Sequence, residues 1–291
     1  MNLFAVLGMH RSGTSLVSRI LNLLGATLGP EDDLMPPKPD NPTGFWESLT
    51  VTQIHDDLFA ELGGRWDRPP VLAEGWETAE KLDPFVNRIR AVVESHFAGA
   101  ELAAWKDPRG SFFIPLWRRV VPVAGTVLCL RDPDEIVGSL AAREGMDPER
   151  AAALFLRYVV AAFHSDGGHL LVRFDDAHAA PRELAVRLAA FVGAPPPDEE
   201  TLRRVSEFVN PSLRHHGVSQ VERGPILRLA RATHALVTRE SREVVAPFLS
   251  LLADRFLLEA RLRGSGGEPA PLSAAAPDLA LAIPGVLDAL G

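Results

Sequence analysis

The 291-residue sequence has only one cysteine, and its acidic residues outnumber its basic residues by 38 to 30. The single Cys129 excludes an internal disulfide and is typical of a reducing compartment. A net charge of −8 disfavours general nucleic-acid binding, so cations in any site must be placed locally. No apolar run approaches the roughly 20 residues of a membrane span, and no signal peptide follows Met1. These absences predict a cytoplasmic protein that neither binds nucleic acid nor spans a membrane.

The most informative stretch lies near the N-terminus, where the apolar run 3–7 predicts a buried parallel strand. A loop rich in hydrogen-bond donors follows between Gly8 and Gly13, and apolar residues then recur at helical spacing up to Gly25. A strand, a glycine-bounded loop and a helix N-terminus form a ring of backbone N–H groups at the positive end of the helix dipole. The stretch therefore predicts an anion site, most often one for a phosphate.

The loop departs from the P-loop of nucleoside triphosphatases, which reads Gly-x-x-x-x-Gly-Lys-Ser/Thr. Gly8, Gly13 and Ser15 keep that spacing, but Thr14 stands in the place of the lysine and Arg11 supplies a cation inside the loop. Without the lysine, the loop lacks the charge that bridges the outer phosphates. We therefore expect a phosphate cradle of another kind, with a glycine-rich turn that binds nothing as the alternative.

Strands alternate with helices over the first two-thirds of the chain, which predicts an α/β fold: a P-loop-like three-layer sandwich with a central parallel sheet. Later strands are expected at 102–105, 126–130 and 170–174, and Ser111 and Asp132 are expected to cap helices. From residue 197 the pattern is helical, which gives a helical C-terminal region. We predict one α/β domain over 1–263, a flexible linker over 264–277 and a tail over 278–291.

Three polar clusters stand where predicted strands end, which is where an open parallel sheet binds its ligands. They are the first loop with Arg11, the Lys-Asp-Pro-Arg turn 106–109, and the segment from Arg131 to Ser139. Arg131 follows its strand directly, whereas Ser139 lies within the next helix, so the two converge only if that helix turns back past the strand end. Otherwise Arg131 would pair with Asp132 or Asp134, and Ser139 would be a solvated hydroxyl.

These segments resemble the sulfotransferase family, whose donor is 3′-phosphoadenosine-5′-phosphosulfate. Residues 8–15, Gly-Met-His-Arg-Ser-Gly-Thr-Ser, look like its 5′-phosphosulfate loop in the arginine form of tyrosylprotein and many bacterial members. Residues 130–139 look like its 3′-phosphate segment, with an arginine and a serine eight positions apart. Residues 106–108 resemble the lysine turn of the tyrosylprotein branch, and the whole resemblance covers roughly residues 3–192.

The resemblance implies a metal-independent enzyme that moves a sulfuryl group in line to a hydroxyl or amine of a small molecule, glycan or peptide. Arg11 and the backbone of residues 12–15 would hold the 5′-phosphosulfate, and Lys106 would contact the sulfuryl group or the bridging oxygen. Arg131 and Ser139 would hold the 3′-phosphate. The residues expected to bind the donor are His10, Arg11, Ser12, Gly13, Thr14, Ser15, Arg131 and Ser139, and those expected to be catalytic are Arg11, Glu47 and Lys106.

An acceptor hydroxyl also needs a base. Glu47 is the first choice, because it follows the proline-rich loop 29–45 that is expected to lie over the site; the alternative is a helix N-terminal carboxylate stabilised by the dipole. His55 and His10 are the second choices. Trp46 and Trp105 would either stack on the adenine, line the acceptor pocket or pack in the core.

Two other functions stay open at this point. A P-loop nucleoside or sugar kinase would use Ser15 and Asp107 as magnesium ligands, although the missing lysine and the Arg131–Ser139 pair oppose it. A binding module that has kept the nucleotide site and lost turnover is the second. The late Gly-x-x-Gly-x-x-Lys lid of cytosolic sulfotransferases is missing, and residues 214–217, Arg-His-His-Gly, are either a substitute lid or a solvated basic turn.

Overall fold

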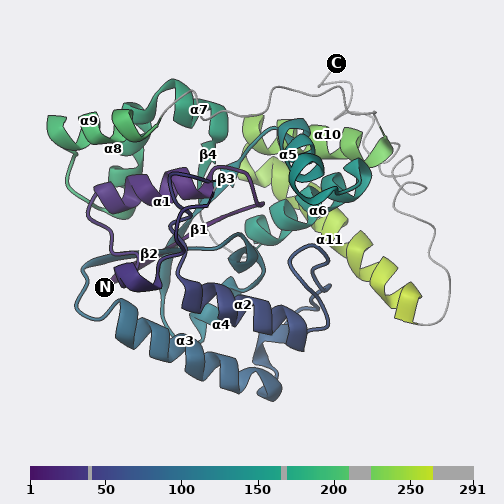
Figure 1. The fold of residues 1–291 in the computed structure, drawn as a ribbon. Coiled ribbons are helices and arrows are strands. Elements are labelled where there is room, and N and C mark those ends of the chain that lie inside the picture. The colour runs from purple at the N-terminus through teal and green to yellow at the C-terminus, as the bar shows by residue number, and fades with distance from the viewer. Residues whose placement is uncertain (39–40, 165–168, 210–223, 265–291) are drawn as a thin grey trace.

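The computed structural model describes residues 1–38, 41–164, 169–209 and 224–264, with side chains to residue 256. Its centre is a parallel four-stranded sheet in the order β2-β1-β3-β4 (Figure 1). The strands are β1 Asn2–Gly8, β2 Leu102–Lys106, β3 Val123–Leu130 and β4 His169–Arg173. All four predicted strands are confirmed, and the last ends one residue early because Phe174 begins a helix.

Alternate residues of β1 enter two separate cores, as the two-residue period of a strand requires. Leu3, Ala5 and Leu7 pack on one face of the sheet, whereas Phe4 and Val6 pack on the other. Because both faces are covered, the strand is apolar throughout and does not alternate with polar residues. Helices above and below one parallel sheet make the three-layer α/β sandwich that the sequence predicted.

Four helices cover the face that carries Phe4 and Val6 (Figure 1). They are α1 Thr14–Leu23, α7 Phe174–Ala179, α8 Pro181–Val192 and α9 Glu199–Phe208. The other face is covered by α2 Leu49–Glu61, α3 Asp83–His96, α4 Ile114–Arg118, α5 Pro133–Glu144, α6 Pro148–His164, α10 Pro225–Arg239 and α11 Arg242–Gly264. Short 3₁₀ helices are η1 Glu31–Asp33, η2 Trp76–Thr78, η3 Glu80–Leu82 and η4 Pro108–Phe112.

Of the two predicted helix caps, one is confirmed and one is wrong. The Asp132 carboxylate accepts from the backbone N–H of Asp134 at 2.8 Å at the start of α5, with Pro133 as the first helical residue. Ser111 lies inside η4, and its Oγ accepts from the backbone N–H of Gly8 at 3.3 Å. This tertiary contact between the first loop and η4 overrides the local capping signal.

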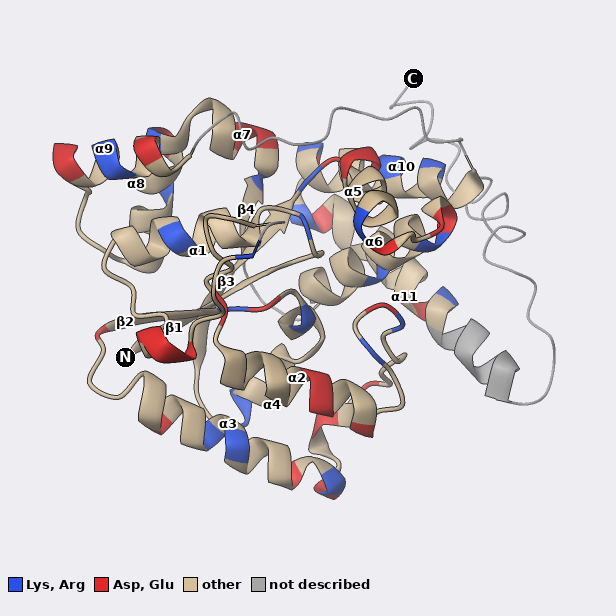
Figure 2. Cartoon of the chain, viewed as in Figure 1, with Lys and Arg blue, Asp and Glu red and all other residues tan. Residues whose placement is uncertain are grey.

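The C-terminal edge of the sheet gathers the polar turns that the sequence singled out. Register places Val6 opposite Lys106 and Leu130 opposite Arg173, so the strands end side by side. Outer helices such as α3 and α9 carry charges of both signs (Figure 2). No described helix is long and apolar enough to cross a lipid bilayer. The predicted tail, lid segment 214–217 and linker, apart from Gly264, lie outside the described residues.

Candidate active site

The loop between β1 and α1 folds into a tight turn that only glycine permits at two positions. The backbone φ angles of Gly8 and Gly13 are 137° and 92°. A Cβ on Gly8 would lie 2.4 Å from the carbonyl oxygen of Cys129, and one on Gly13 would lie 2.6 Å from the Phe174 ring. The loop thus packs directly against β3 and α7, with the backbone freedom of glycine required at both ends.

Helix α1 begins at this turn with its N-terminal N–H groups free of side-chain caps. Gly13 is the N-cap residue, and the first turn, 14–17, contains no acidic side chain. Exposed N–H donors at the positive end of a helix dipole attract an anion. Arg11 adds a full charge beside them and has a positive φ of 71°, which is uncommon for a residue with a side chain.

Arg11 and the predicted 3′-phosphate segment meet at one wall of the site. Arg11 Nε donates to Ser139 Oγ at 3.0 Å, and Arg131 Nη1 donates to the carbonyl oxygen of Arg11 at 3.1 Å. Helix α5 therefore does turn back past the end of β3, which was the condition for Arg131 and Ser139 to lie close together. Ser139 is 1% exposed, so it is a buried hydroxyl and not a solvated one.

Arg131 is held rigidly between two partners. Its Nε donates to Glu135 Oε2 at 2.6 Å, and its guanidinium lies 4.1 Å from the centre of the Phe174 ring. Both arrangements stabilise a fixed orientation, the first by charge and the second by a cation–π contact. The ion-pair partner is thus Glu135, not Asp132 or Asp134, and Asp134 instead accepts from Arg231 Nε at 2.6 Å.

On the opposite side of the first loop, Lys106 reaches from the end of β2 toward α1. Its Nζ donates to Ser15 Oγ at 3.2 Å and to the carbonyl oxygen of Phe45 at 3.1 Å, and it forms an ion pair with Glu47. Glu47 is turned inward after Trp46, whose φ is 56°. Burial raises the pKa of Glu47, and the charge of Lys106 opposes that shift.

A single cleft connects these groups. Its lining includes the predicted residues His10, Arg11, Gly13, Thr14, Ser15, Glu47, Lys106 and Arg131. Ser12 and Ser139 lie behind its wall, where Ser12 is 1% exposed. The lining also contains residues that the sequence did not single out for the site: Asn41, Pro42, Thr43, Phe45, Arg143, Phe174, His178, Phe208 and Val209. We call this hollow the donor cleft, after the donor that the sequence resemblance predicts.

One of these overlooked residues had a signal in the sequence. Arg143 stands four positions after Ser139 on α5, so the two share a helix face, and a basic residue there extends the cationic wall. The loop 29–45, which includes Asn41, was expected to cover the site only as a whole. Asn41 now gives it a specific contact, because its Nδ2 donates to Ser15 Oγ at 3.4 Å and to the Gly44 carbonyl at 2.7 Å.

The two histidines proposed as second-choice bases occupy different places. His10 lines the donor cleft and packs against Trp66 and Tyr158, with ring centroids 4.8 and 5.6 Å away. Burial, reinforced by Arg109, lowers its pKa well below the ordinary value, so the ring is neutral at pH 7. Its Nε2 is buried without a hydrogen-bond partner among the described residues.

His55 lies in the core and outside the cleft. Its Nδ1 is 2.8 Å from Asp107 Oδ2, and its Nε2 accepts from Trp117 Nε1 at 2.9 Å. With both ring nitrogens occupied and no exposed surface, His55 has no free site for a substrate proton. Trp105 is likewise in the core, where it stacks on Trp117 at 4.5 Å.

Asp107 is a structural carboxylate in this arrangement. It is fully buried, and its Oδ1 accepts from both Nη1 and the backbone N–H of Arg109 at 3.0 Å, while Oδ2 contacts His55. Burial alone would raise its pKa, but Arg109 and His55 hold the pKa well below its ordinary value. Because both oxygens are committed, Asp107 is poorly placed for the magnesium role that a kinase would give it.

Comparison with known proteins adds a family assignment to this geometry. A family model described as the sulfotransferase family matches residues 4–211. No curated protein matches the chain.

Solved structures that resemble the chain include the sulfotransferase domain of an olefin synthase from Synechococcus PCC 7002, with 16% identity, a TM-score of 0.47 and coverage of 82% of this chain and 94% of that one. Sulfotransferase STF9 from Mycobacterium avium has 15% identity and a TM-score of 0.46, and the match covers 87% of this chain and 76% of that one. A sulfotransferase from Alicyclobacillus acidocaldarius has 15% identity and a TM-score of 0.42, and the match covers 83% of this chain and 97% of that one.

Proposed function

The chain belongs to the sulfotransferase family, and from this premise we propose that it transfers a sulfuryl group in line from 3′-phosphoadenosine-5′-phosphosulfate to a hydroxyl or amine acceptor. The observation that carries the proposal is the convergence of Arg11, Lys106 and Arg131 on one cleft in an acidic protein. That cleft begins at an uncapped helix N-terminus. Three cations and a ring of N–H groups suit a ligand with several anionic groups.

The two ends of the donor would be held by different elements. The N–H groups of residues 12–15 and the Arg11 guanidinium would bind the 5′-phosphosulfate. Arg131 would bind the 3′-phosphate, which distinguishes this donor from ATP, and the buried Ser139, which accepts from Arg11 Nε, would hold Arg11 beside it. Because Glu135 and the Arg11 carbonyl hold Arg131 from one side, its other N–H groups are pre-oriented for a phosphate.

Transfer would form a bond from the acceptor oxygen or nitrogen to sulfur while the bond from sulfur to the bridging phosphate oxygen breaks. The electron pair of the broken bond stays on the phosphate, where Lys106 and Arg11 would neutralise it. Glu47 would take the proton of the acceptor. Lys106 contacts both Glu47 and Ser15, so it lies between the proposed base and the loop that would hold the phosphosulfate.

This arrangement couples the two catalytic groups. When Lys106 turns toward the developing charge on the phosphate, the buried Glu47 carboxylate loses its counter-ion. A buried carboxylate without a counter-ion binds a proton more strongly. Glu47 would therefore become a better base at the moment when the acceptor must release its proton.

Thermal-shift measurements test the donor. Adenosine 3′,5′-bisphosphate should raise the unfolding temperature of the protein, and ATP with magnesium should raise it little. A preference for ATP with magnesium would replace the proposal with a kinase. Binding of the bisphosphate without sulfate transfer from labelled donor to a panel of alcohols, phenols, amines and sugars would favour the inactive binding module.

A further inference from the structure

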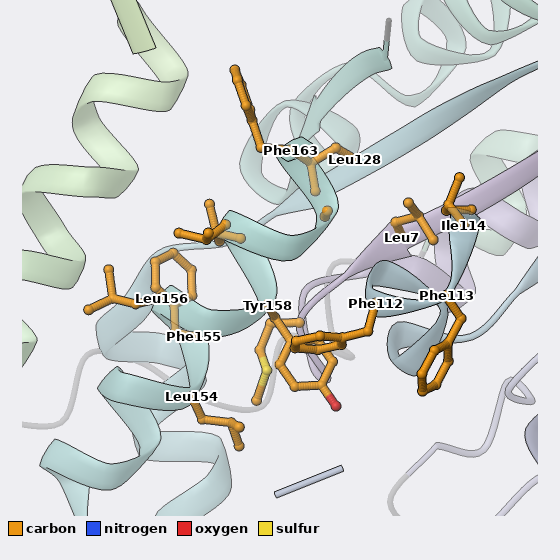
Figure 3. Close-up of a cluster of buried hydrophobic side chains, with 14 of the residues drawn as sticks. Leu7, Phe112, Phe113, Ile114, Leu128, Leu154, Phe155, Leu156, Tyr158 and Phe163 are labelled. Atoms are coloured by element: carbon orange, nitrogen blue, oxygen red, sulfur yellow. The ribbon is translucent and has the colours of Figure 1, made fainter. Parts of the chain in front are cut away.

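The stretch of chain that leads into Glu47 has little hydrophobic packing of its own. None of the residues 29–38 is buried, and Leu34 packs against the core only in part. Elsewhere in the molecule, side chains such as Phe112 and Phe113 are fixed within a cluster of buried apolar groups (Figure 3). A stretch without such packing depends on hydrogen bonds for its position.

Asp33, the last residue of η1, accepts these hydrogen bonds with a single carboxylate. Its Oδ1 accepts from the backbone N–H and the Oγ1 hydroxyl of Thr50 at 3.1 and 2.6 Å. Its Oδ2 accepts from the Ser48 hydroxyl and from His96 Nε2, the latter at 3.0 Å. Asp33 thus ties η1 to the start of α2 and to the end of α3.

The Asp33 carboxylate is ionised, as a group that only accepts hydrogen bonds must be. Burial favours its neutral form, but the hydrogen bonds from Ser48, Thr50 and His96 lower the pKa of Asp33 below its ordinary value of 3.8. The side chain is 17% exposed, so water competes little for its oxygens. All of these contacts are therefore present at neutral pH.

Ser48 carries the anchor to Glu47, its neighbour in the chain. The Ser48 hydroxyl donates to Asp33 and accepts from the backbone N–H of Val51 at 3.0 Å, which caps α2. The backbone is paired as well, because the N–H of Met35 donates to the carbonyl oxygen of Glu47 at 2.8 Å. The backbone of Glu47 is thus held against the segment that follows η1.

The chain needs this support because it is strained just before Glu47. Trp46 has a φ of 56°, in the left-handed region that costs energy for a residue with a side chain. Lys106 holds the Glu47 carboxylate and the carbonyl oxygen of Phe45 from the inner side. The contacts of Asp33 hold the chain after Trp46 from the outer side. Without them the turn would relax and the Glu47 side chain would leave its inward direction.

Resting on the proposed function, we propose that Asp33 is a positioning residue for sulfuryl transfer, which acts through Ser48 to keep the Glu47 carboxylate directed into the donor cleft. Asp33 lies outside the lining of that cleft, so it touches neither donor nor acceptor. Its contribution is the accuracy with which the proposed base is placed. The donor would be held by the first loop and α5, so donor binding should not depend on Asp33.

Asp33→Asn tests this role, because it replaces one acceptor oxygen with an NH₂ donor that faces other donors. The readout is the titration of the Glu47 carboxyl, followed by ¹³C NMR of protein with labelled glutamate and assigned with Glu47→Gln. In the wild type, burial raises the pKa of Glu47 above 4.5. A Glu47 side chain that turns toward water in Asp33→Asn should titrate closer to 4.5.

This titration reports the position of Glu47 and not the stability of the protein. The charged groups that face Glu47, namely Lys106, Asp107 and Arg109, are the same in both proteins. A merely structural role of Asp33 would lower the resistance to urea and leave the Glu47 titration of the folded protein unchanged.

Two further variants make the comparison specific. Ser48→Ala cuts the link to Glu47 and leaves the contacts of Asp33 with Thr50 and His96 in place, so it should shift the titration in the same direction. It also serves if Asp33→Asn does not fold. The control is Asp57→Asn, a surface carboxylate of α2 that pairs with an arginine, and it should titrate as the wild type does. An unchanged Glu47 titration in Ser48→Ala or in folded Asp33→Asn overturns the proposal.

Transfer provides the second test, with labelled donor and the fastest acceptor among the alcohols, phenols, amines and sugars. Asp33→Asn should lower kcat by about tenfold or more, the cost of a misplaced catalytic group, with the affinity for adenosine 3′,5′-bisphosphate unchanged. In a Glu47→Gln background the same substitution should cost nothing further, because it acts through Glu47. A further loss there overturns the proposal. If the wild type fails to bind the bisphosphate or to sulfate any acceptor, the proposed function is contradicted, and the titration still decides whether Asp33 positions Glu47.

Discussion

Glu47 and Lys106 form an ion pair in the donor cleft although 59 residues separate them in the sequence. Their residues are only 6% and 3% exposed. In such surroundings each charge depends on the other, because an unpaired buried charge is costly. The pair also joins the end of β2 to the segment that follows loop 41–45, so the proposed base and the proposed cation are positioned together.

Replacing Glu47 with glutamine tests the proposed base. The substituted amide keeps the shape of the side chain and can still accept from Lys106, so binding of the bisphosphate should be unchanged. Transfer should slow by about 10²-fold or more, because the variant cannot take a proton. Single-turnover rates with labelled donor provide the measurement. Glu61→Gln, which removes a surface carboxylate paired with Lys81, is the control. Full activity of Glu47→Gln would move the role to another group, with His10 next in place.

The pH dependence of transfer should carry the signature of a buried carboxylate. Because burial raises the pKa of Glu47 above 4.5, the acid limb of kcat/KM should fall at a pH above that value. Stability should depend on pH in the opposite direction to the rate. A raised carboxyl pKa stabilises the folded state at low pH, and this contribution is lost as pH rises through the folded pKa. Rate profiles of the wild type and denaturation profiles of wild type and Glu47→Gln test both. An acid limb at or below pH 4.5 would exclude Glu47 as the titrating base.

Much of the sheet could be predicted from the sequence, because short apolar runs bounded by turn residues report buried parallel strands directly. The glycine-bounded turn before α1 was also visible, since the spacing of Gly8 and Gly13 and the helical pattern after them are local features. The structure explains that spacing by the contacts of these glycines with Cys129 and Phe174, which lie far away in sequence. Local patterns thus located the loop without revealing what it packs against.

Side-chain pairing could not be read in the same way. The sequence offered Asp132 and Asp134 as partners of Arg131, but the turn of α5 brings Glu135 to it. It offered His55 as a base, but the fold places that ring between Asp107 and Trp117. Ser111 had the local setting of a cap and makes a tertiary contact instead. Each outcome depends on where distant elements lie, and the functional roles of the cleft residues stay predictions.

Arg131→Ala should weaken binding of adenosine 3′,5′-bisphosphate by roughly 2–4 kcal/mol, because it removes a desolvated charge partner of the ligand. Titration calorimetry measures the loss. The substitution also leaves the buried Glu135 without its Nε contact, so urea unfolding must be measured alongside to separate folding from binding. Arg203→Ala on the surface of α9 is the control and should change neither. Unchanged affinity in a folded Arg131→Ala protein would remove Arg131 from the site.

Asp107 and Asp56 both pair with Arg109 but differ in burial. Comparing them tests how much a buried ion pair and an exposed ion pair each contribute to stability. The side chain of Asp107 is 0% exposed and that of Asp56 is 43% exposed. Asp107→Asn should therefore lower the free energy of unfolding by about 3–5 kcal/mol, and Asp56→Asn by about 1 kcal/mol or less.

The Asp107 effect should also depend on pH. Because its folded pKa is lowered, its contribution is present above the unfolded value of 3.8 and is lost as pH falls through the folded pKa. Urea denaturation at pH 7 and pH 3 should thus show a smaller difference between wild type and Asp107→Asn at the lower pH. Equal costs for the two Asn variants at pH 7 would contradict a structural role for the buried carboxylate.

Comparing Gly8→Ala with Gly25→Ala separates the energetic cost of a strained backbone from the cost of a steric clash. Both residues have positive φ angles, 137° and 96°, but a Cβ on Gly25 meets no atom within 4 Å, whereas one on Gly8 meets the Cys129 carbonyl at 2.4 Å. Gly25→Ala should cost about 1–2 kcal/mol, the penalty of the left-handed backbone alone.

Gly8→Ala should cost roughly 1–3 kcal/mol more, because the first loop must move away from β3. Urea denaturation of the two variants gives the comparison. Displacing the loop also misplaces the N–H groups that would hold the phosphosulfate, so bisphosphate affinity should fall in Gly8→Ala and stay at the wild-type level in Gly25→Ala. If Gly8→Ala bound the bisphosphate normally, the cradle would not need the close approach between the first loop and β3, and the anion would have to be held mainly by the arginine side chains.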